Sequence, residues 1–172
     1  MDRKKLEEAL EKLHPQSFTW ALRCCRGDRE SAADVLQNTY LKILEGKARY
    51  QGQSGLKTWL FSIIRFTAID HYRVQSRRSP HALEAEEQLL QISVPGTTSM
   101  EPSDQQLLLI RALNQLSVQQ QQVLHLVFYQ ECTIEEAAEV MRISLGTART
   151  HYERGKRHLR ERLTAEIQHK KR

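Results

Sequence analysis

The sequence predicts an all-α protein of two small helical domains joined by a flexible linker, with a helix-turn-helix in the C-terminal domain. In the N-terminal part, apolar residues recur every three or four positions, which is the spacing of one face of a helix. The alternation of apolar and polar residues that marks a half-buried strand is absent. Near the C-terminus, residues 133–152 form two short amphipathic stretches around a tight turn. We therefore expect domains at residues 1–78 and 106–172, with residues 79–105 as the linker.

The first domain is expected to be helical apart from one loop. Apolar residues at helical spacing run over residues 6–25, and Gly27 and Asp28 then break the segment. We expect two helices in this segment. A third helix follows over residues 32–44, and Thr39 falls among its core-facing positions. This pattern predicts a small helical bundle.

A loop over residues 46–55 then leads into an apolar helix over residues 58–72. The loop contains Tyr50 among Gly, Gln and Ser, and three arginines follow the helix: Arg73, Arg77 and Arg78. A single-stranded base needs a stacking platform beside phosphate-neutralising charge, which this combination would supply. The alternative is that Tyr50 packs back onto its own domain.

The linker is acidic and contains no Lys or Arg. Residues 79–105 hold three prolines, Gly96, a Thr/Ser cluster and five acids. This composition predicts a flexible tether, with one short helix over residues 83–92. A second interpretation is that an acidic segment between two basic domains mimics nucleic acid or occupies a positively charged channel.

The segment after residue 132 has the layout of a DNA-reading motif. Thr133 and Glu136 predict a capping box, residues 144–146 supply a cap and a turn, and helical spacing resumes at Thr147. The second helix is basic, and its side chains suit the phosphates and base edges of a major groove. The alternative is a solvated face or a coiled-coil flank. Two residues depart from the usual pattern of this motif. Arg142 stands where the turn usually has Gly, and Ala148 stands where the second helix usually has a bulkier aliphatic residue.

Composition favours a polyanionic partner and excludes several other classes. The 172 residues carry a formal net charge of +5. Without a signal peptide or a long apolar run, we expect a cytoplasmic protein with no membrane partner. The cysteines, Cys24, Cys25 and Cys132, have neither a disulfide nor a metal-ligand spacing, and the seven histidines are scattered. We therefore expect no metal and no cofactor, and we find no catalytic constellation, so an enzyme is not predicted.

Taken in order, these segments resemble the RNA polymerase sigma factors of the extracytoplasmic-function (ECF) type, in the sigma-70 family. GDRESAADVLQNTYLKIL (27–44) is similar to the family's polymerase-binding helix, and YQGQSGLKTWLFSIIRFTAIDHYR (50–73) to its promoter-melting loop and helix. Residues 112–163 are similar to the domain that reads the upstream promoter element. The resemblance covers nearly the whole chain and implies that the linker replaces the third domain of larger sigma factors.

The resemblance also implies a role for individual residues. Those matched to core polymerase binding are Asp34, Gln37, Asn38 and Leu41. Those matched to the minus-ten element are Tyr50, Gln51, Gln53, Ser54, Arg65, Phe66 and Arg73. Those matched to the minus-thirty-five element are Arg149, Thr150, His151, Arg154, Lys156 and Arg157. The implied partners are core polymerase, promoter DNA as duplex and melted strand, and an anti-sigma factor.

One departure from the family suggests a regulatory hypothesis. Ala33 and Asn38 stand where the family has acids, so Asp34 is the remaining carboxylate of a face that is markedly acidic in the family. Phosphorylation of Thr39 first and Ser31 second, by a Ser/Thr kinase, would restore negative charge. In the simpler interpretation, Thr39 packs on its helix and Ser31 helps to cap it. The alternative function for the whole chain is a free helix-turn-helix regulator that does not join polymerase.

Overall fold

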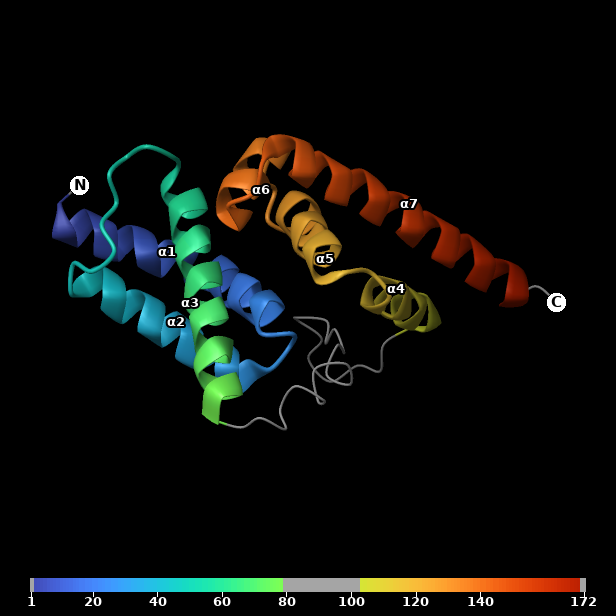
Figure 1. Cartoon of the computed structure of the whole chain (residues 1–172), viewed down its shortest axis with the longest axis horizontal. Coiled ribbons are helices and arrows are strands. Elements are labelled where there is room, and N and C mark those ends of the chain that lie inside the picture. The colour runs from blue at the N-terminus through green and yellow to red at the C-terminus, as the bar shows by residue number, and fades with distance from the viewer. Residues whose placement is uncertain (1, 79–102, 171–172) are drawn as a thin grey trace. The chain divides into compact units, whose positions relative to one another are not determined.

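The structure, a computed structural model, describes residues 2–78 and 103–170. Every regular element within these ranges is helical, which confirms the predicted all-α class. In chain order they are α1 (Arg3–Cys24), α2 (Arg29–Leu44), α3 (Leu56–Arg78), α4 (Asp104–Asn114), α5 (Val118–Leu124), the π-helical turn η2 (His125–Tyr129), α6 (Ile134–Met141) and α7 (Leu145–Lys170) (Figure 1). The chain forms two compact units. The short helix predicted at residues 83–92 lies outside the described residues.

The first unit begins with one long helix where the sequence suggested two. Helix α1 continues through Pro15, so the helix predicted to be the third in the domain is the second, α2. The corner between them turns through left-handed backbone at Arg26 (φ 56°) and Gly27 (φ 87°), and the Gly27 amide donates to the Leu22 carbonyl at 2.8 Å. Asp28 then caps α2, because its carboxylate accepts from the amides of residues 30 and 31.

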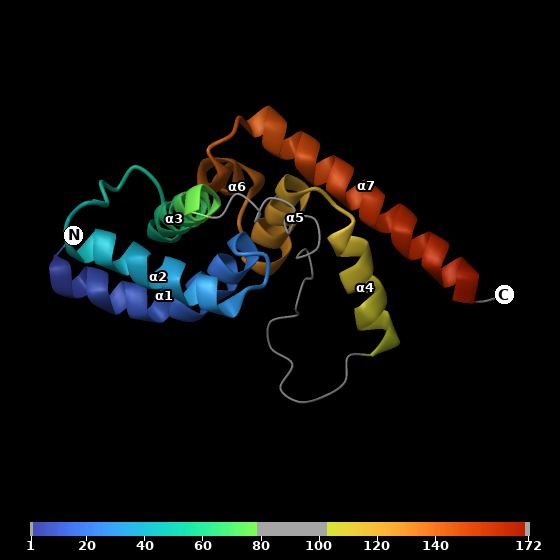
Figure 2. The same ribbon diagram turned by 60° about the horizontal axis from the view of Figure 1, so that its bottom comes forward.

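The core of the first unit lies where α3 packs on α1 and α2. Figure 2 shows α3 crossing over the α1–α2 pair, and each of the three helices contacts the other two. Trp20 and Phe61 are fully buried, with ring centroids 6.0 Å apart, and Trp20 Nε1 donates to the Phe61 carbonyl at 3.0 Å. This bond satisfies the one polar group of a large buried ring. The sequence pattern predicted α3 over residues 58–72, but the helix extends to Arg78.

The second unit is built on α7, which packs against α4 and α5. Helices α4 and α5 each begin with a capping box, Ser103 with Gln106 and Ser117 with Gln120. Helix α4 starts at residue 104, two residues inside the segment expected to be linker. Gly155 lets α7 approach α5 closely, since a Cβ there would lie 3.1 Å from Leu124 Cδ1.

The helix-turn-helix consists of α6, a short turn and the start of α7. The predicted capping box is present: Glu136 N donates to Thr133 Oγ1 at 3.1 Å, and Thr133 N donates to the Glu136 carboxylate at 2.8 Å. Arg142, in the turn, has φ 52°, a left-handed conformation that favours glycine. Ser144 Oγ accepts from the Thr147 amide at 3.1 Å and caps the helix. Helix α7 therefore begins at Leu145, two residues before the predicted start at Thr147.

Candidate nucleic-acid interfaces

Helix α7 presents an exposed basic face opposite its buried side. Its buried side includes Ala148 and Gly155. Four of the six residues predicted for the minus-thirty-five element are exposed on the opposite face: Arg149, Thr150, Arg154 and Arg157. The helical period brings Thr150, Arg154 and Arg157 together, because they are spaced by four and three residues. Arg149 borders the same face, since it lies about two turns before Arg157. The arrangement suits a helix that lies in a major groove.

Arg149 and Thr150 already have partners in the free protein. Arg149 forms an exposed ion pair with Glu135 of α6, at 3.4 Å. A pair this exposed is worth about 0–1 kcal/mol, so exchange of Glu135 for a DNA group costs little. The Thr150 hydroxyl donates to the Gly146 carbonyl at 2.9 Å, which leaves its lone pairs available as acceptors.

Lys156 and His151 do not lie on this exposed face. Lys156 Nζ lies 4.3 Å from the ring centroid of Tyr152 and 3.2 Å from the Glu153 carboxylate. The same ring stacks on Phe128 at 5.9 Å. His151 is half-buried at the edge of the packed side. Lys156 is therefore engaged within its own domain, and the structure does not bring these two residues together with Arg154.

A second candidate surface lies on α3. Phe66, Ile69 and Arg73 are exposed and share one face, because they are spaced by three and four residues. Ile69 was not predicted from the sequence, although the spacing from Phe66 would have revealed it. Arg65 lies off this face and is half-buried, and burial lowers the pKa of its guanidinium from the ordinary value. The structure therefore brings Phe66 and Arg73 together and separates Arg65 from them.

The loop between α2 and α3 is tied to α3 by Tyr50. The Tyr50 hydroxyl donates to the Ser54 carbonyl at 2.6 Å, and its ring lies 5.4 Å from the ring of Trp59. Gln51 and Gln53, which lie between Tyr50 and Ser54 in the chain, are exposed. Tyr50 itself is half-buried, and it packs back onto its own domain. The loop is held at both ends and presents polar side chains at its tip.

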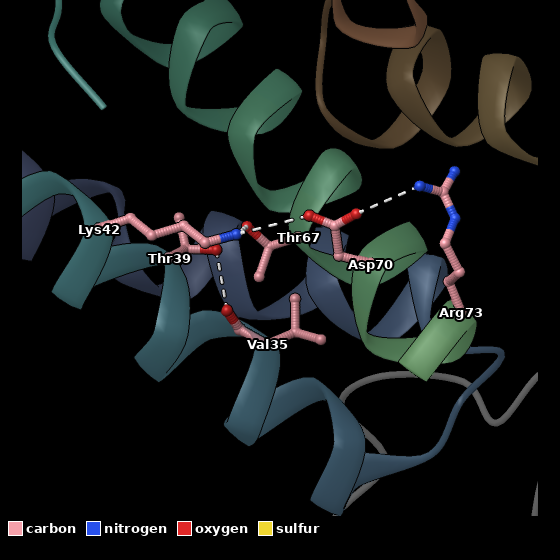
Figure 3. Close-up of polar contacts among 6 residues, drawn as sticks. All are labelled: Val35, Thr39, Lys42, Thr67, Asp70 and Arg73. Atoms are coloured by element: carbon pink, nitrogen blue, oxygen red, sulfur yellow. Dashed lines mark hydrogen bonds and ion pairs between the residues drawn. The ribbon is translucent and has the colours of Figure 1, made fainter. Parts of the chain in front are cut away.

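One carboxylate lies between two cations where α2 meets α3. Asp70 is 3.8 Å from Lys42 Nζ of α2 and 3.9 Å from Arg73 of α3 (Figure 3). Lys42 also donates to Thr67 Oγ1 at 3.3 Å and lies 5.9 Å from the ring centroid of Phe66. The sequence pattern did not reveal that Lys42 joins this cluster, because Lys42 is 28 positions from Asp70 in the chain. The cluster places a lysine of α2 beside the candidate DNA-binding face of α3.

The residues matched to polymerase binding form one exposed face of α2. Asp34, Gln37, Asn38 and Leu41 are all exposed and follow the three- and four-residue spacing of one side of a helix. Gln37 and Leu41 also line an open groove of about 380 Å³ between α1 and α2. The groove is mostly apolar, with Phe18 among its walls. A groove of this kind suits a helix or a loop of a protein partner.

The hypothesis of phosphorylation at Thr39 or Ser31 is not supported by their positions. Thr39 is fully buried, and its hydroxyl donates to the Val35 carbonyl at 2.8 Å (Figure 3). Ser31 is buried at the start of α2, where its amide donates to the Asp28 carboxylate. A kinase needs an accessible hydroxyl, and neither residue offers one while α2 is packed. The structure agrees with the simpler interpretation of Thr39, which packs on its helix. The cap of α2 is the Asp28 carboxylate, and Ser31 contributes its amide to that cap.

Within the described ranges, no group of three His, Cys, Asp or Glu side chains is arranged to hold a metal ion. Helices in the same ranges lack the combination of length and hydrophobicity that crossing a membrane requires. Cys25 is buried against α3, and burial raises the pKa of its thiol to about 12. Such a thiol is a poor nucleophile and metal ligand.

Comparison with known proteins identifies the class to which these surfaces belong. The chain matches the family models of sigma-70 region 2 over residues 9–78 and sigma-70 region 4 over residues 106–159. It is 31% identical over 150 residues to the ECF RNA polymerase sigma factor SigX of Bacillus subtilis, covering 78% of this chain and 71% of that protein. It is 32% identical over 142 residues to the RNA polymerase sigma factor YlaC of the same organism, covering 78% and 79%.

Two solved structures share the fold. One is the sigma factor RpoE from Bartonella quintana in complex with the anti-sigma factor NepR, with a TM-score of 0.69, 24% identity and coverage of 94% of this chain and 98% of that one. The other is CnrH in complex with the cytosolic domain of CnrY, with a TM-score of 0.62, 18% identity and coverage of 95% and 90%.

Helical domains that carry regions 2 and 4 define the sigma-70 class of transcription initiation factors, which bind RNA polymerase and recognise promoter DNA. The chain belongs to this family as an RNA polymerase sigma factor of the extracytoplasmic-function type. The resemblance seen in the sequence is thereby confirmed.

Proposed function

We propose that this sigma factor divides its work between two domains, residues 1–78 and 106–172, with residues 79–105 as the tether. The first domain binds core polymerase through α2 and the minus-ten element through α3 and the loop before it. The second binds the minus-thirty-five element through α7. The observation that carries the proposal is the exposed basic face of α7, because four predicted DNA contacts share it on the helix that forms the second half of a capped helix-turn-helix.

Reconstitution tests this division. The full chain is mixed with core polymerase from the same bacterium, and the complex selects duplexes from a random-sequence DNA pool. We expect co-elution with core polymerase and enrichment of two separated sequence elements, followed by transcription from the selected DNA. Binding to duplex DNA without co-elution would instead identify a free helix-turn-helix regulator, which acts in the same compartment but does not join polymerase.

For polymerase docking, we propose the exposed face of α2 that includes Asp34, Gln37 and Leu41. Support comes from their shared exposure and from the groove that two of them line. Asp34 is a single carboxylate, so docking should depend on apolar and amide contacts more than on charge. Ala33→Glu combined with Asn38→Glu is expected to strengthen binding to core polymerase and to make it more sensitive to salt, since it adds two negative charges. Unchanged affinity at low salt would argue against this face.

For promoter opening, we propose that the loop over residues 46–55 receives an unstacked base of the minus-ten element. Support comes from the tethered loop, its polar tip and Tyr50, which is only half-buried. A base removed from the duplex needs a stacking surface and hydrogen-bonding groups in one place. Tyr50, Gln51 and Gln53 supply both.

For regulation, we propose that an anti-sigma factor competes with polymerase for the α1–α2 groove. RpoE, which shares this fold, is known in complex with the anti-sigma factor NepR. An inhibitor that covers Gln37 and Leu41 would block the proposed docking face directly. Loss of core-polymerase binding on addition of such a protein, restored by Phe18→Glu in the groove wall on α1, outside the proposed docking face, tests the competition. Phosphorylation at Thr39 or Ser31 is no part of the proposal, since both hydroxyls are buried.

A further inference from the structure

The cluster at the α2–α3 junction joins a helix proposed to bind polymerase to a helix proposed to bind DNA. Asp70 lies between Lys42 of α2 and Arg73 of α3, and its two carboxylate oxygens face different cations (Figure 3). Lys42 makes a second polar contact, with the Thr67 hydroxyl at 3.3 Å. Two cationic side chains from different helices are therefore held beside one carboxylate.

The distances argue against a role confined to stability. Both ion pairs are close to the 4 Å limit of direct contact, and all three side chains are more than a third exposed. Solvent screens such pairs, so they contribute little to the free energy of folding. The clearer effect of the two ion pairs is to restrict the rotamers of Lys42 and Arg73, because Lys and Arg are among the side chains with the most rotamer freedom to lose.

We infer that Asp70 is a positioning residue for promoter binding, which holds Lys42 and Arg73 beside the exposed ring of Phe66 so that both cations meet the DNA backbone. This inference rests on the proposed role of α3 at the minus-ten element. It adds Lys42, on α2, to the residues that contact promoter DNA. Lys42 lies within 5.9 Å of the Phe66 ring, so a strand that passes over that ring comes within reach of Lys42.

The sign of one substitution separates positioning from simple electrostatics. Removal of a carboxylate near DNA should strengthen binding if charge alone matters, because it removes repulsion of phosphates. Removal of a positioning carboxylate should weaken binding, because Lys42 and Arg73 must then be ordered by the DNA itself. Asp70→Asn is close to isosteric and removes the charge, so the two explanations predict opposite signs. Because exposed pairs of this kind contribute about 0–1 kcal/mol, the ordering they provide can change promoter affinity by no more than about fivefold, and we expect promoter binding to be weaker within that limit.

The experiment uses the full chain bound to core polymerase and a promoter duplex selected by the wild-type holoenzyme. Affinity is measured against salt concentration for Asp70→Asn, Asp70→Glu, Lys42→Gln and Lys42→Arg. The matched control is Glu8→Gln, which removes the same charge from an exposed position on α1. Thermal unfolding and core-polymerase affinity are recorded for every variant.

We expect Asp70→Asn to weaken promoter binding while the control strengthens it slightly or leaves it unchanged. Lys42→Gln should weaken binding and reduce the slope of log affinity against log salt by roughly 0.7–0.9, the value for one phosphate contact. Lys42→Arg and Asp70→Glu should retain most of the affinity. Stronger binding by Asp70→Asn, or a Lys42→Gln variant that loses only thermal stability and keeps the wild-type salt slope, would overturn the inference. If the wild-type holoenzyme selects no promoter, the proposed function fails first.

Discussion

Substitution of Arg142 should separate backbone strain from side-chain contacts in the helix-turn-helix. Arg142 has φ 52°, and a residue with a Cβ in this conformation costs about 1–2 kcal/mol. Glycine removes that cost but loses about 0.4–1 kcal/mol through the greater freedom of the unfolded chain. Arg142→Gly should therefore be more stable than Arg142→Ala by roughly 0.5–1 kcal/mol. For a domain of this size, the difference corresponds to roughly 2–8 °C in the melting temperature.

The alanine variant is the matched control, because both variants lose the same side chain and differ only in the backbone term. Calorimetry on the full-length chain is the appropriate assay, since it resolves the unfolding of the two domains. Binding to the selected minus-thirty-five element should be equal for the two variants, because the turn keeps its geometry. An alanine variant as stable as the glycine variant would refute the account of strain at this turn.

Three further predictions concern function and reactivity. Tyr50→Phe should keep promoter opening, measured by permanganate reactivity of thymines, whereas Tyr50→Ala should lose about 1–3 kcal/mol of base stacking; equal opening by both would exclude stacking on the ring. Arg154→Ala should cost about 1–3 kcal/mol at one base pair of the minus-thirty-five element if Arg154 contacts a base edge, but should weaken all sequences equally if it contacts a phosphate. Cys25, whose pKa is raised to about 12, should react with iodoacetamide at pH 8 about a thousandfold more slowly than an ordinary thiol of pKa near 8.5, and rapid labelling of Cys25 itself, located by peptide mapping, would contradict its burial.

Features that depend on neighbouring residues in the chain were predictable. The capping box of Thr133 and Glu136 was anticipated, because its two hydrogen bonds span only three residues. The helical period likewise placed Arg149, Arg154 and Arg157 on one side of α7 and Asp34, Gln37 and Leu41 on one side of α2. The same period grouped Thr39 with apolar positions, which agrees with its burial and not with a phosphorylation site.

Local signals also misled the prediction in places where two tendencies compete. The sequence suggested two helices before residue 25, but α1 continues through Pro15, since residues on both sides of it, from Leu10 to Leu22, are buried in the core of the first unit. Lys156 was matched to the minus-thirty-five element through the resemblance to the family, and that role stays a prediction. Its position one turn after Tyr152 places it over that ring in the free protein.

The sequence by itself determined the helical class, the helix caps and the faces of individual helices, because hydrogen bonding and periodicity act over a few residues. Only the tertiary structure decided which of these faces meet. The angle at which α3 crosses α2 brings Asp70 to Lys42. Helix α5 approaches α7 so closely at residue 155 that a side chain larger than that of glycine would crowd Leu124. The fold of the loop onto α3 likewise brings Tyr50 to Trp59. These contacts depend on packing between segments distant in the chain, and no local pattern specifies how such segments are placed against each other.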